Sequence, residues 1–150
     1  MSSPVRVWWS GGLGSSKYFE TGGGGALRTT GSLSYGRSVV IVRNMELFEG
    51  IDGWTSNDES AVLLGLRSRG HGRYTIAALG VGHAHWHDEL PCERQISACS
   101  DPAYNVNGST LAYDFGVHAD KRVIGLAVNV SGAIGPPKIS LIVLALSLEL

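Results

Sequence analysis

The chain has 150 residues, with 12 Lys and Arg against 13 Asp and Glu, and its net charge is −1. This length predicts one domain, and the balanced charge excludes a strongly basic nucleic-acid binder and an acidic tail protein. Charged residues make up only 17%, and glycine contributes 21 residues. A helical bundle, whose surface is normally rich in Glu and Lys, is therefore disfavoured, and short strands joined by tight turns are favoured.

Residues 1–37 differ from the rest of the chain because glycine, serine and threonine dominate them, with the run Gly22–Gly25 at their centre. Such a segment loses much backbone entropy on ordering and offers little apolar surface in return. We therefore expect residues 1–37 to form an extended arm and residues 38–150 to form a β domain. The apolar part of the arm is Val5–Trp9 (VRVWW).

Six segments beyond the arm predict β-strands, because they are β-branched runs or alternate apolar with polar residues between turn signals. They are Ser38–Arg43, Ala61–Arg67, Gly72–Leu79, Ser109–His118, Lys121–Val130 and Ile139–Leu150. Ala119-Asp120 is the candidate hairpin turn between two of them. Met45–Phe48 and Asp88–Gln95 are each expected to form a helical turn.

The segment Ile139–Leu150 is the most apolar part of the chain and follows the break Gly135-Pro136-Pro137. Both of its faces are largely apolar near the middle, which predicts a central strand buried on both sides. It is too short for a helical bilayer span of about 20 residues. The sequence therefore predicts that this segment belongs to a core and is not a membrane anchor.

Together these elements predict an all-β fold, an antiparallel β-sandwich or barrel of jelly-roll type with a glycine-rich extended N-terminal arm. Its core would be built from one face of each strand. The residues expected to be buried are Val40, Val42, Leu64, Leu66, Ile76, Tyr113, Phe115, Ile124, Leu126, Val128, Leu141, Val143 and Leu144.

Three histidines alternate in the segment Gly82–Glu89 (GHAHWHDE). In a strand they would line one face, and imidazoles beside a carboxylate can bind zinc, nickel, copper or iron. The spacing of His83, His85 and Glu89 resembles the first metal motif of cupins, which are small β-barrels. That resemblance implies a metal site on these residues, with His118 as a distant fourth ligand.

The cupin match is incomplete. Ala77 and Ile96 stand where that motif has flanking glycines, and the second motif, Pro-x-Gly-x-x-His, does not occur. A polar loop with solvent-facing histidines explains the same residues. We therefore expect neither a bound metal nor another cofactor, and a cupin-like metal-dependent enzyme is the alternative.

Trp54 lies in Asp52–Thr55 (DGWT), whose composition predicts a loop. A loop tryptophan beside acidic and Asn residues can stack on a sugar ring, so a carbohydrate-binding β-sandwich is the second alternative. A tryptophan that covers the end of a sandwich core is the simpler explanation of the residue, and we favour it.

No motif fixes a reaction, since the nucleophile elbow Gly-x-Ser-x-Gly is absent from the sequence, and we do not expect an enzyme. A glycine-rich arm with an apolar tip on a compact β domain resembles the layout of tailed-bacteriophage capsid decoration (cement) proteins and related small virion proteins. The resemblance implies a homotrimer that binds the major capsid protein or other virion subunits, without nucleic acid or membrane.

The partner-binding residues under this hypothesis are Val5, Val7, Trp8, Trp9 and Trp54. The strand-like tip of the arm would add to the sheet edge of a neighbour, and the two adjacent tryptophans would fill apolar pockets there. We therefore expect residues 1–25 to cross to another chain.

The N-terminal residues contain no apolar run of about 7–15 residues, so no secretory signal is predicted. The expected location is the capsid surface of the virion, and otherwise the cytoplasm. Cys92 and Cys99 lie in a polar stretch, where a local disulfide and two free thiols are both open.

Overall fold

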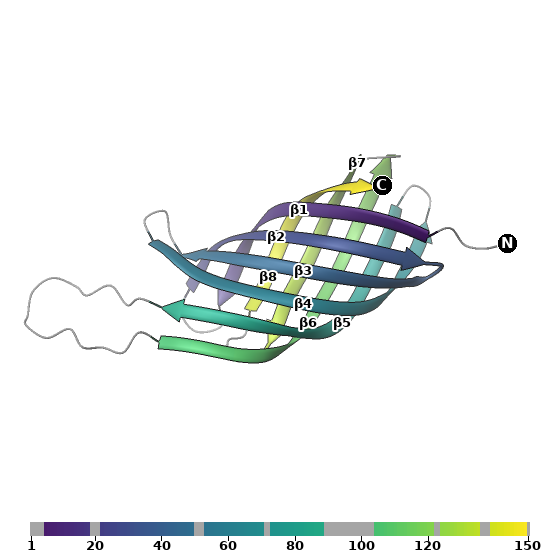
Figure 1. Ribbon diagram of the computed structural model, residues 1–150. Helices are drawn as coiled ribbons and strands as arrows, with labels where there is room; N and C mark the ends of the chain where they lie inside the picture. Colours follow the sequence, from purple (N-terminus) through teal and green to yellow (C-terminus); the bar gives the residue numbers. More distant parts are fainter. Residues whose placement is uncertain are drawn as a thin grey trace, which may run out of the picture.

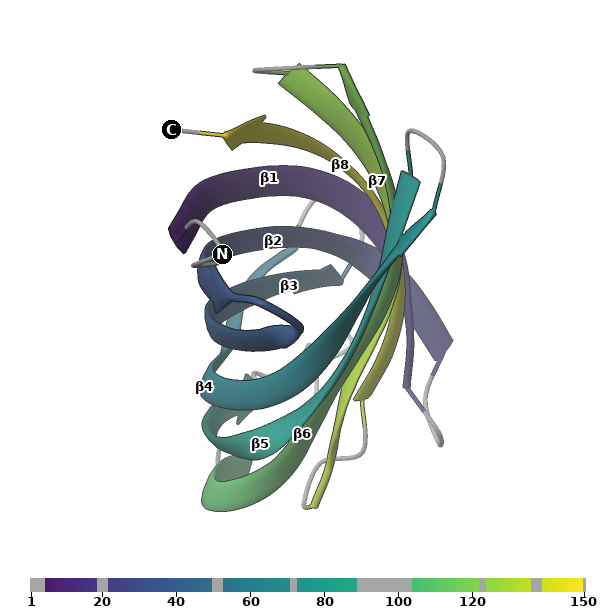
Figure 2. The same cartoon turned by 90° about the vertical axis from the view of Figure 1, so that its right-hand side faces the viewer.

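Eight β-strands form one closed antiparallel barrel in the computed structural model, which describes residues 5–18, 22–49, 53–70, 73–88, 104–121, 124–135 and 139–149. Each strand pairs with its neighbour in sequence, and β1 also pairs with β8. The strands are β1 (Val5–Tyr18), β2 (Gly22–Tyr35), β3 (Ser38–Glu49), β4 (Gly53–Gly70), β5 (Arg73–Asp88), β6 (Tyr104–Lys121), β7 (Ile124–Ile134) and β8 (Ile139–Glu149). Figures 1 and 2 show the barrel from two sides.

The strand register shows that the barrel is strongly sheared. A row of directly paired residues leaves β6 at Leu111, passes through Val81 in β5 and Trp9 in β1, and returns to β6 at Lys121. The row therefore comes back ten residues further along the strand. Closure with such an offset requires strands that are tilted by about 35–45° from the barrel axis.

The prediction of an all-β antiparallel fold is confirmed, and of the two predicted architectures, sandwich and barrel, the barrel is correct. The β-sandwich and jelly-roll forms are wrong, because consecutive strands are neighbours all the way round and the sheet has no second layer. The eight strands simply follow one another up and down, so no long crossing connection of the Greek-key kind is needed.

The glycine-rich arm expected for residues 1–37 is also wrong. Residues 5–18 and 22–35 form β1 and β2, which pair with each other over their whole length. β1 pairs on its other side with β8, and β2 with β3. Backbone hydrogen bonds to a neighbouring strand on each side offset the entropy that the glycines lose on ordering. The composition of residues 1–37 does not show these partner strands, which explains the wrong prediction.

Some glycines of this region are required by close approach between strands. A Cβ atom on Gly12 would lie 2.4 Å from the Leu144 carbonyl oxygen and 2.7 Å from the Ala145 Cβ, whereas one on the adjacent Gly11 would meet nothing within 4 Å. Gly36 in the turn between β2 and β3 has a φ of 63°, which other residues rarely adopt.

The adjacent pair Gly12 and Gly11 therefore provides a matched test of the β1–β8 seam. Gly12→Ala is expected to lower the free energy of unfolding by about 1–3 kcal/mol, since the new methyl group overpacks against β8. Gly11→Ala is expected to be neutral or slightly stabilising. Urea titration of the refolded barrel measures both, and equal effects of the two substitutions would contradict this seam.

Two local expectations are corrected by the strands. Met45–Phe48 lies within β3 and is extended, not helical. Ala119 and Asp120 lie within β6, which continues to Lys121, so the connection to β7 falls at residues 122–123. Asp88 ends β5, and residues 89–95 lie outside the described residues. Both errors have one cause: the observed strands are longer than the segments predicted from the sequence, and a short stretch of residues does not show where a strand ends.

Most of the expected core residues face outward, so that prediction is wrong. Only Ile76 and Val143 are buried, at 4% and 0% exposure, whereas Leu64 and Leu66 are each 67% exposed. The side chain of Leu141 is outside the described residues, and Tyr113 is half-buried. The other exposed members are Val40, Val42, Phe115, Ile124, Leu126, Val128 and Leu144.

The strand β8 shows the reason for this inversion. Its residues Ile142, Leu144, Leu146 and Leu148 point outward, and Val143 and Ala145 point into the barrel. The strand is therefore not buried on both sides. An eight-stranded barrel encloses a space just wide enough for side chains to fill, so small and polar residues face inward and the larger apolar face is left outside.

Candidate functional site: the outer wall and the lumen

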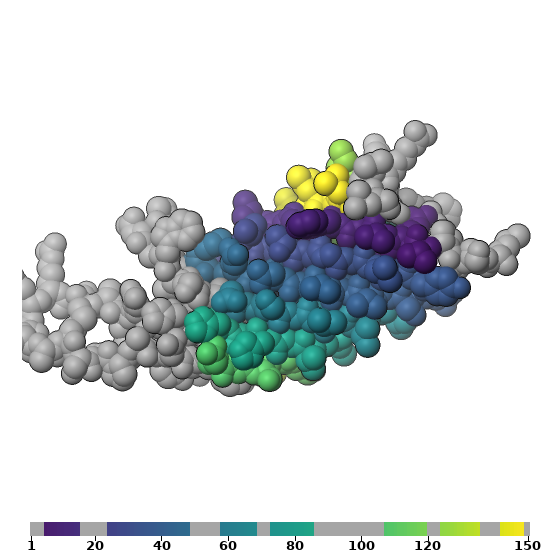
Figure 3. Space-filling view, viewed as in Figure 1, coloured from purple at the N-terminus to yellow at the C-terminus, as the bar shows by residue number. Residues whose placement is uncertain are grey.

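The outer wall of the barrel is apolar on all eight strands. Large exposed hydrophobic residues occur on each of them, from Val7 on β1 to Leu148 on β8. Figure 3 shows the part of this wall that β1–β5 present as a continuous surface of side chains. Soluble monomers rarely expose contiguous apolar patches larger than a few hundred Å², so a wall of this kind requires an apolar environment.

The apolar wall is a band with polar edges. On β4 the outward positions between Ser60 and Ser68 are all apolar, with Leu64 at their centre. On β5 the outward positions between Thr75 and His83 are likewise apolar. The stretch from Ser60 to Ser68 spans about 26 Å along the strand, or roughly 20 Å along the barrel axis after tilting. This height is close to the roughly 25 Å apolar band of transmembrane β-barrels.

One polar edge crosses several strands at the end opposite the termini. Asn44, Ser60, His83 and Ser109 are paired in succession across β3–β6, and the Ser60 hydroxyl donates to Asn44 Oδ1 at 3.1 Å. The next outward row along these strands is equally polar. It consists of Glu46, Asp58, His85 and Asn107.

The lumen has the opposite character, because buried charges meet inside it. The Arg43 guanidinium on β3 donates to both carboxylate oxygens of Glu59 on β4, at 2.9 and 2.8 Å. It also donates to the carbonyl oxygens of Tyr113 on β6, at 2.7 Å, and of Gly132 on β7, at 3.1 Å. Arg43 therefore crosses the lumen, and both charged side chains are 0% exposed.

A second ion pair joins strands on different sides of the lumen. Arg28 on β2 donates to the carboxylate of Asp114 on β6, and both side chains are 2% exposed. Neither charge contacts bulk solvent, so each compensates the other in a region of low polarity. The two pairs balance two positive with two negative charges inside the barrel.

Near the turn end of the barrel, an aromatic group packs around a third arginine. The guanidinium of Arg67 lies 4.2 Å from the ring centre of Tyr74 and 5.5 Å from that of Trp8. The Tyr74 ring also stacks on the His118 ring, with ring centres 4.6 Å apart. Cation–π and stacking contacts hold these large side chains together, and they fill the lumen at this end.

The structure separates the residues expected to bind a partner. Val5, Val7 and Trp9 face outward, with Trp9 62% exposed, whereas Trp8 is 3% exposed and faces the lumen. Trp54 lies in β4, and its side chain is outside the described residues. These residues belong to the barrel wall itself, so they do not form the tip of an arm.

The alternative metal site is not assembled among the described residues. His83 and His85 point outward from β5, while His118 on β6 points into the lumen and pairs in register with Tyr74 near the opposite end of β5. Glu89 lies outside the described residues, as do Cys92 and Cys99. Within the described ranges, no group of three or more His, Cys, Asp and Glu side chains is placed to hold a metal ion.

The lumen charges Arg28, Arg43, Glu59 and Asp114 were not identified from sequence. A signal exists for Asp114, because Leu111, Phe115 and Val117 at the alternate positions of its strand are apolar. In a soluble sheet that pattern places the charge in water, and in a membrane barrel it places the charge in the lumen. The sequence does not separate a soluble sheet from a membrane barrel, because only closure of the strands shows whether the apolar face lies outside the barrel.

No family model and no curated protein sequence matches the chain. Two solved structures are similar to it. The N-terminal β-barrel domain of Pseudomonas aeruginosa OprF matches with a TM-score of 0.68 and 11% identity over 100% of both chains. Neisserial surface protein A (NspA) matches with a TM-score of 0.64 and 9% identity over 99% of this chain and 98% of that chain.

No helix long and apolar enough to cross a membrane occurs in the described parts of the chain.

The similarities to OprF and NspA correct the functional prediction. The capsid decoration function, the capsid partner, the absence of a membrane and the virion or cytoplasmic location are wrong, because the chain matches the bacterial proteins OprF and NspA over almost its whole length, and neither of them is a capsid protein. At 9–11% identity the likeness shows the fold alone: this chain has the fold of an eight-stranded closed β-barrel.

Proposed function

We propose that this chain is an integral protein of a bacterial outer membrane, which it crosses as an eight-stranded β-barrel. The observation that carries this proposal is the reversed polarity of the barrel. Its outer wall is apolar over a band edged by polar residues, and its charged pairs lie in the lumen. Lipid replaces water around such a wall, and a closed sheet leaves no strand edge unpaired in the hydrocarbon.

The connections between strands support one orientation. Gly36-Arg37 and residues 71–72 and 122–123 join strands at the end that also carries both termini. Longer connections lie at the other end, and the longest is residues 89–103. Outer-membrane barrels have short periplasmic turns and longer extracellular loops. The termini and short turns are therefore assigned to the periplasm, and residues 89–103 to the cell exterior.

The lumen supports a sealed barrel and not an open channel. Arg43 reaches across from β3 to β6 and β7, and the Arg67 cluster fills the turn end. Eight-stranded barrels have just enough interior space for such side chains. We propose a non-catalytic membrane barrel that holds its exterior connections at the cell surface, a role that fits the name of the structurally similar Neisserial surface protein A.

The adjacent tryptophans Trp8 and Trp9 give the sharpest test. Two variants each keep one of them and carry phenylalanine at the other three tryptophan positions, and both are refolded into vesicles. Phospholipids with brominated acyl chains are expected to quench Trp9 strongly, because it faces lipid, and to leave Trp8 nearly unquenched, because it lies in the lumen.

Two controls make this result decisive. The same variants in vesicles of unbrominated lipid set the reference intensity for each tryptophan. Equal quenching of Trp8 and Trp9, or a barrel that folds and stays monomeric in buffer without detergent or lipid, would contradict the membrane proposal.

A further inference from the structure

A groove of about 990 Å³ crosses the barrel from β7 to the turn between β2 and β3. Its outward-facing lining comes from two neighbouring rows of residues on β4–β7, each paired in register. One row is Val130, Phe115, Ala77 and Leu66, and the other is Val128, Val117, Thr75 and Ser68. Because the rows run across tilted strands, the groove descends obliquely from the middle of the apolar band to its turn-end edge.

The groove has a simple cause in the sequence of β5. Its two outward residues Ala77 and Thr75 are small, and they lie between Leu66 on β4 and the larger Phe115 and Val117 on β6. Neighbouring strands are about 4.7–4.9 Å apart, so the depression extends roughly 14 Å from β7 to β4. The walls are apolar, and a flexible hydrocarbon chain matches such a shallow, narrow shape.

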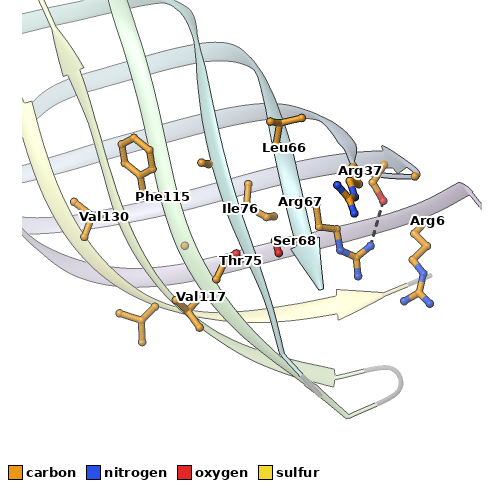
Figure 4. Close-up of a pocket in the computed structure, with 15 residues that line it drawn as sticks. Arg6, Arg37, Leu66, Arg67, Ser68, Thr75, Ile76, Phe115, Val117 and Val130 are labelled. Carbon is orange, nitrogen blue, oxygen red and sulfur yellow. Dashed lines mark hydrogen bonds between the residues drawn. The ribbon is translucent and has the colours of Figure 1, made fainter. Parts of the chain in front are cut away.

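Arginines gather where the groove reaches the turn end. Arg37 and Arg6 both line this end, and Figure 4 shows Arg37, Arg67 and Arg6 in succession beyond Leu66. Arg67 also lies there, but its side chain is directed to Ser34, Trp8 and Tyr74. Arg37 is exposed, and its carbonyl oxygen accepts the Arg67 backbone N–H at 2.7 Å, which fixes the turn against β4.

We propose that this groove binds one phospholipid of the periplasmic leaflet, with an acyl chain over Ala77 and the phosphate on Arg37. This inference rests on the proposed membrane location and orientation. At the edge of the band the phosphate of a lipid lies at the level of the turn-end arginines, and basic side chains near a membrane surface attract anionic lipid. An apolar groove that ends at the exposed Arg37 guanidinium is complementary to an amphiphilic anion.

A second copy of the chain fits this groove less well. Two copies in one membrane have the same orientation, so a neighbour packed here would bring its own turn-end arginines to the same level. That arrangement adds positive charge where Arg37 already lies, whereas a phosphate brings the opposite charge.

Lipid retention by the intact barrel tests the proposal. The full chain in detergent micelles is incubated with phosphatidylglycerol, with diacylglycerol carrying the same acyl chains, or with inorganic phosphate, and native mass spectrometry counts the bound molecules. We expect one phosphatidylglycerol per barrel, with much weaker retention of diacylglycerol and phosphate. Diacylglycerol retained as well as phosphatidylglycerol would overturn the phosphate contact, and phosphate bound as tightly as the lipid would overturn the acyl contact.

Matched variants locate the site. Ala77→Phe fills the groove and is expected to weaken phosphatidylglycerol retention by at least about tenfold, since displacing two buried methylene groups alone has that effect. Thr29→Phe adds the same ring to the outer face of β2 and is expected to leave retention unchanged. Arg37→Ala is expected to weaken retention by about fivefold, and Arg73→Ala, an exposed arginine outside the groove, is expected to leave it unchanged.

Failure of this proposal is distinguishable from failure of the proposed function. If Trp9 is quenched by brominated lipid but Ala77→Phe retains phosphatidylglycerol like the unmodified chain, the barrel is in the membrane and the groove does not bind the lipid. If Ala77→Phe instead abolishes a dimer of the unmodified chain, the groove is an interface between two copies and the lipid proposal is overturned. An unquenched Trp9 would reject both proposals.

Discussion

Glu59→Leu is expected to lower the free energy of unfolding by about 3–5 kcal/mol, because it leaves the Arg43 guanidinium without a counter-charge inside the lumen. Arg43 and Glu59 are both fully buried, and two hydrogen bonds of 2.8–2.9 Å join them. Among the described residues, the other buried carboxylate in the lumen is Asp114, which is already bonded to Arg28. Urea unfolding in vesicles, followed by the loss of the compact band in unheated gel electrophoresis, measures the effect.

The double variant Arg43→Met with Glu59→Leu is the control for this result. It removes both charges together, and replacing a buried ion pair by apolar residues of similar volume is often neutral or stabilising. The double variant is therefore expected to be substantially more stable than Glu59→Leu alone, with a favourable coupling between the two positions. Additive losses from the two single substitutions would show that Arg43 and Glu59 act independently, contrary to the geometry.

Leu64→Arg is expected to destabilise the barrel by about 2–4 kcal/mol in vesicles, because its side chain lies at the centre of the apolar band on β4, which the proposed membrane location surrounds with lipid. Leu64 is 67% exposed and is equally far from the band-edge residues Ser60 and Ser68. In a water-soluble barrel the same substitution would replace an exposed leucine by an exposed charge and cost little. The sign and size of this effect therefore separate lipid from water as the surroundings of the wall.

The matched control for Leu64→Arg is Ser68→Arg on the same face of the same strand. Ser68 lies at the turn-end edge of the band, where an added arginine is expected to cost roughly 0–1 kcal/mol. The difference between the two variants reports depth in the membrane, since both introduce the same side chain into β4. Equal free energies of unfolding for the two variants would rule out the band as assigned.

The sequence by itself determined that the chain is all-β and where several strands lie. Ser38–Arg43, Ala61–Arg67 and Ser109–His118 each fall within an observed strand, because β-branched runs and two-residue alternation are local properties. Alternation also determines which residues share a face: Leu111, Phe115 and Val117 do point the same way. It leaves open whether that face meets a protein core, water or lipid.

Only the tertiary structure decided the direction of each face, because closure depends on pairing between distant segments. β1 pairs with β8 through contacts such as Leu13 with Leu144, and this pairing converts the glycine-rich N-terminal residues from an expected arm into barrel wall. Closure around eight strands leaves a narrow lumen. Arg43 and Glu59 are then enclosed with partners, while Leu64 and Leu144 remain outside on the apolar wall, because the narrow lumen has no room for the larger apolar face.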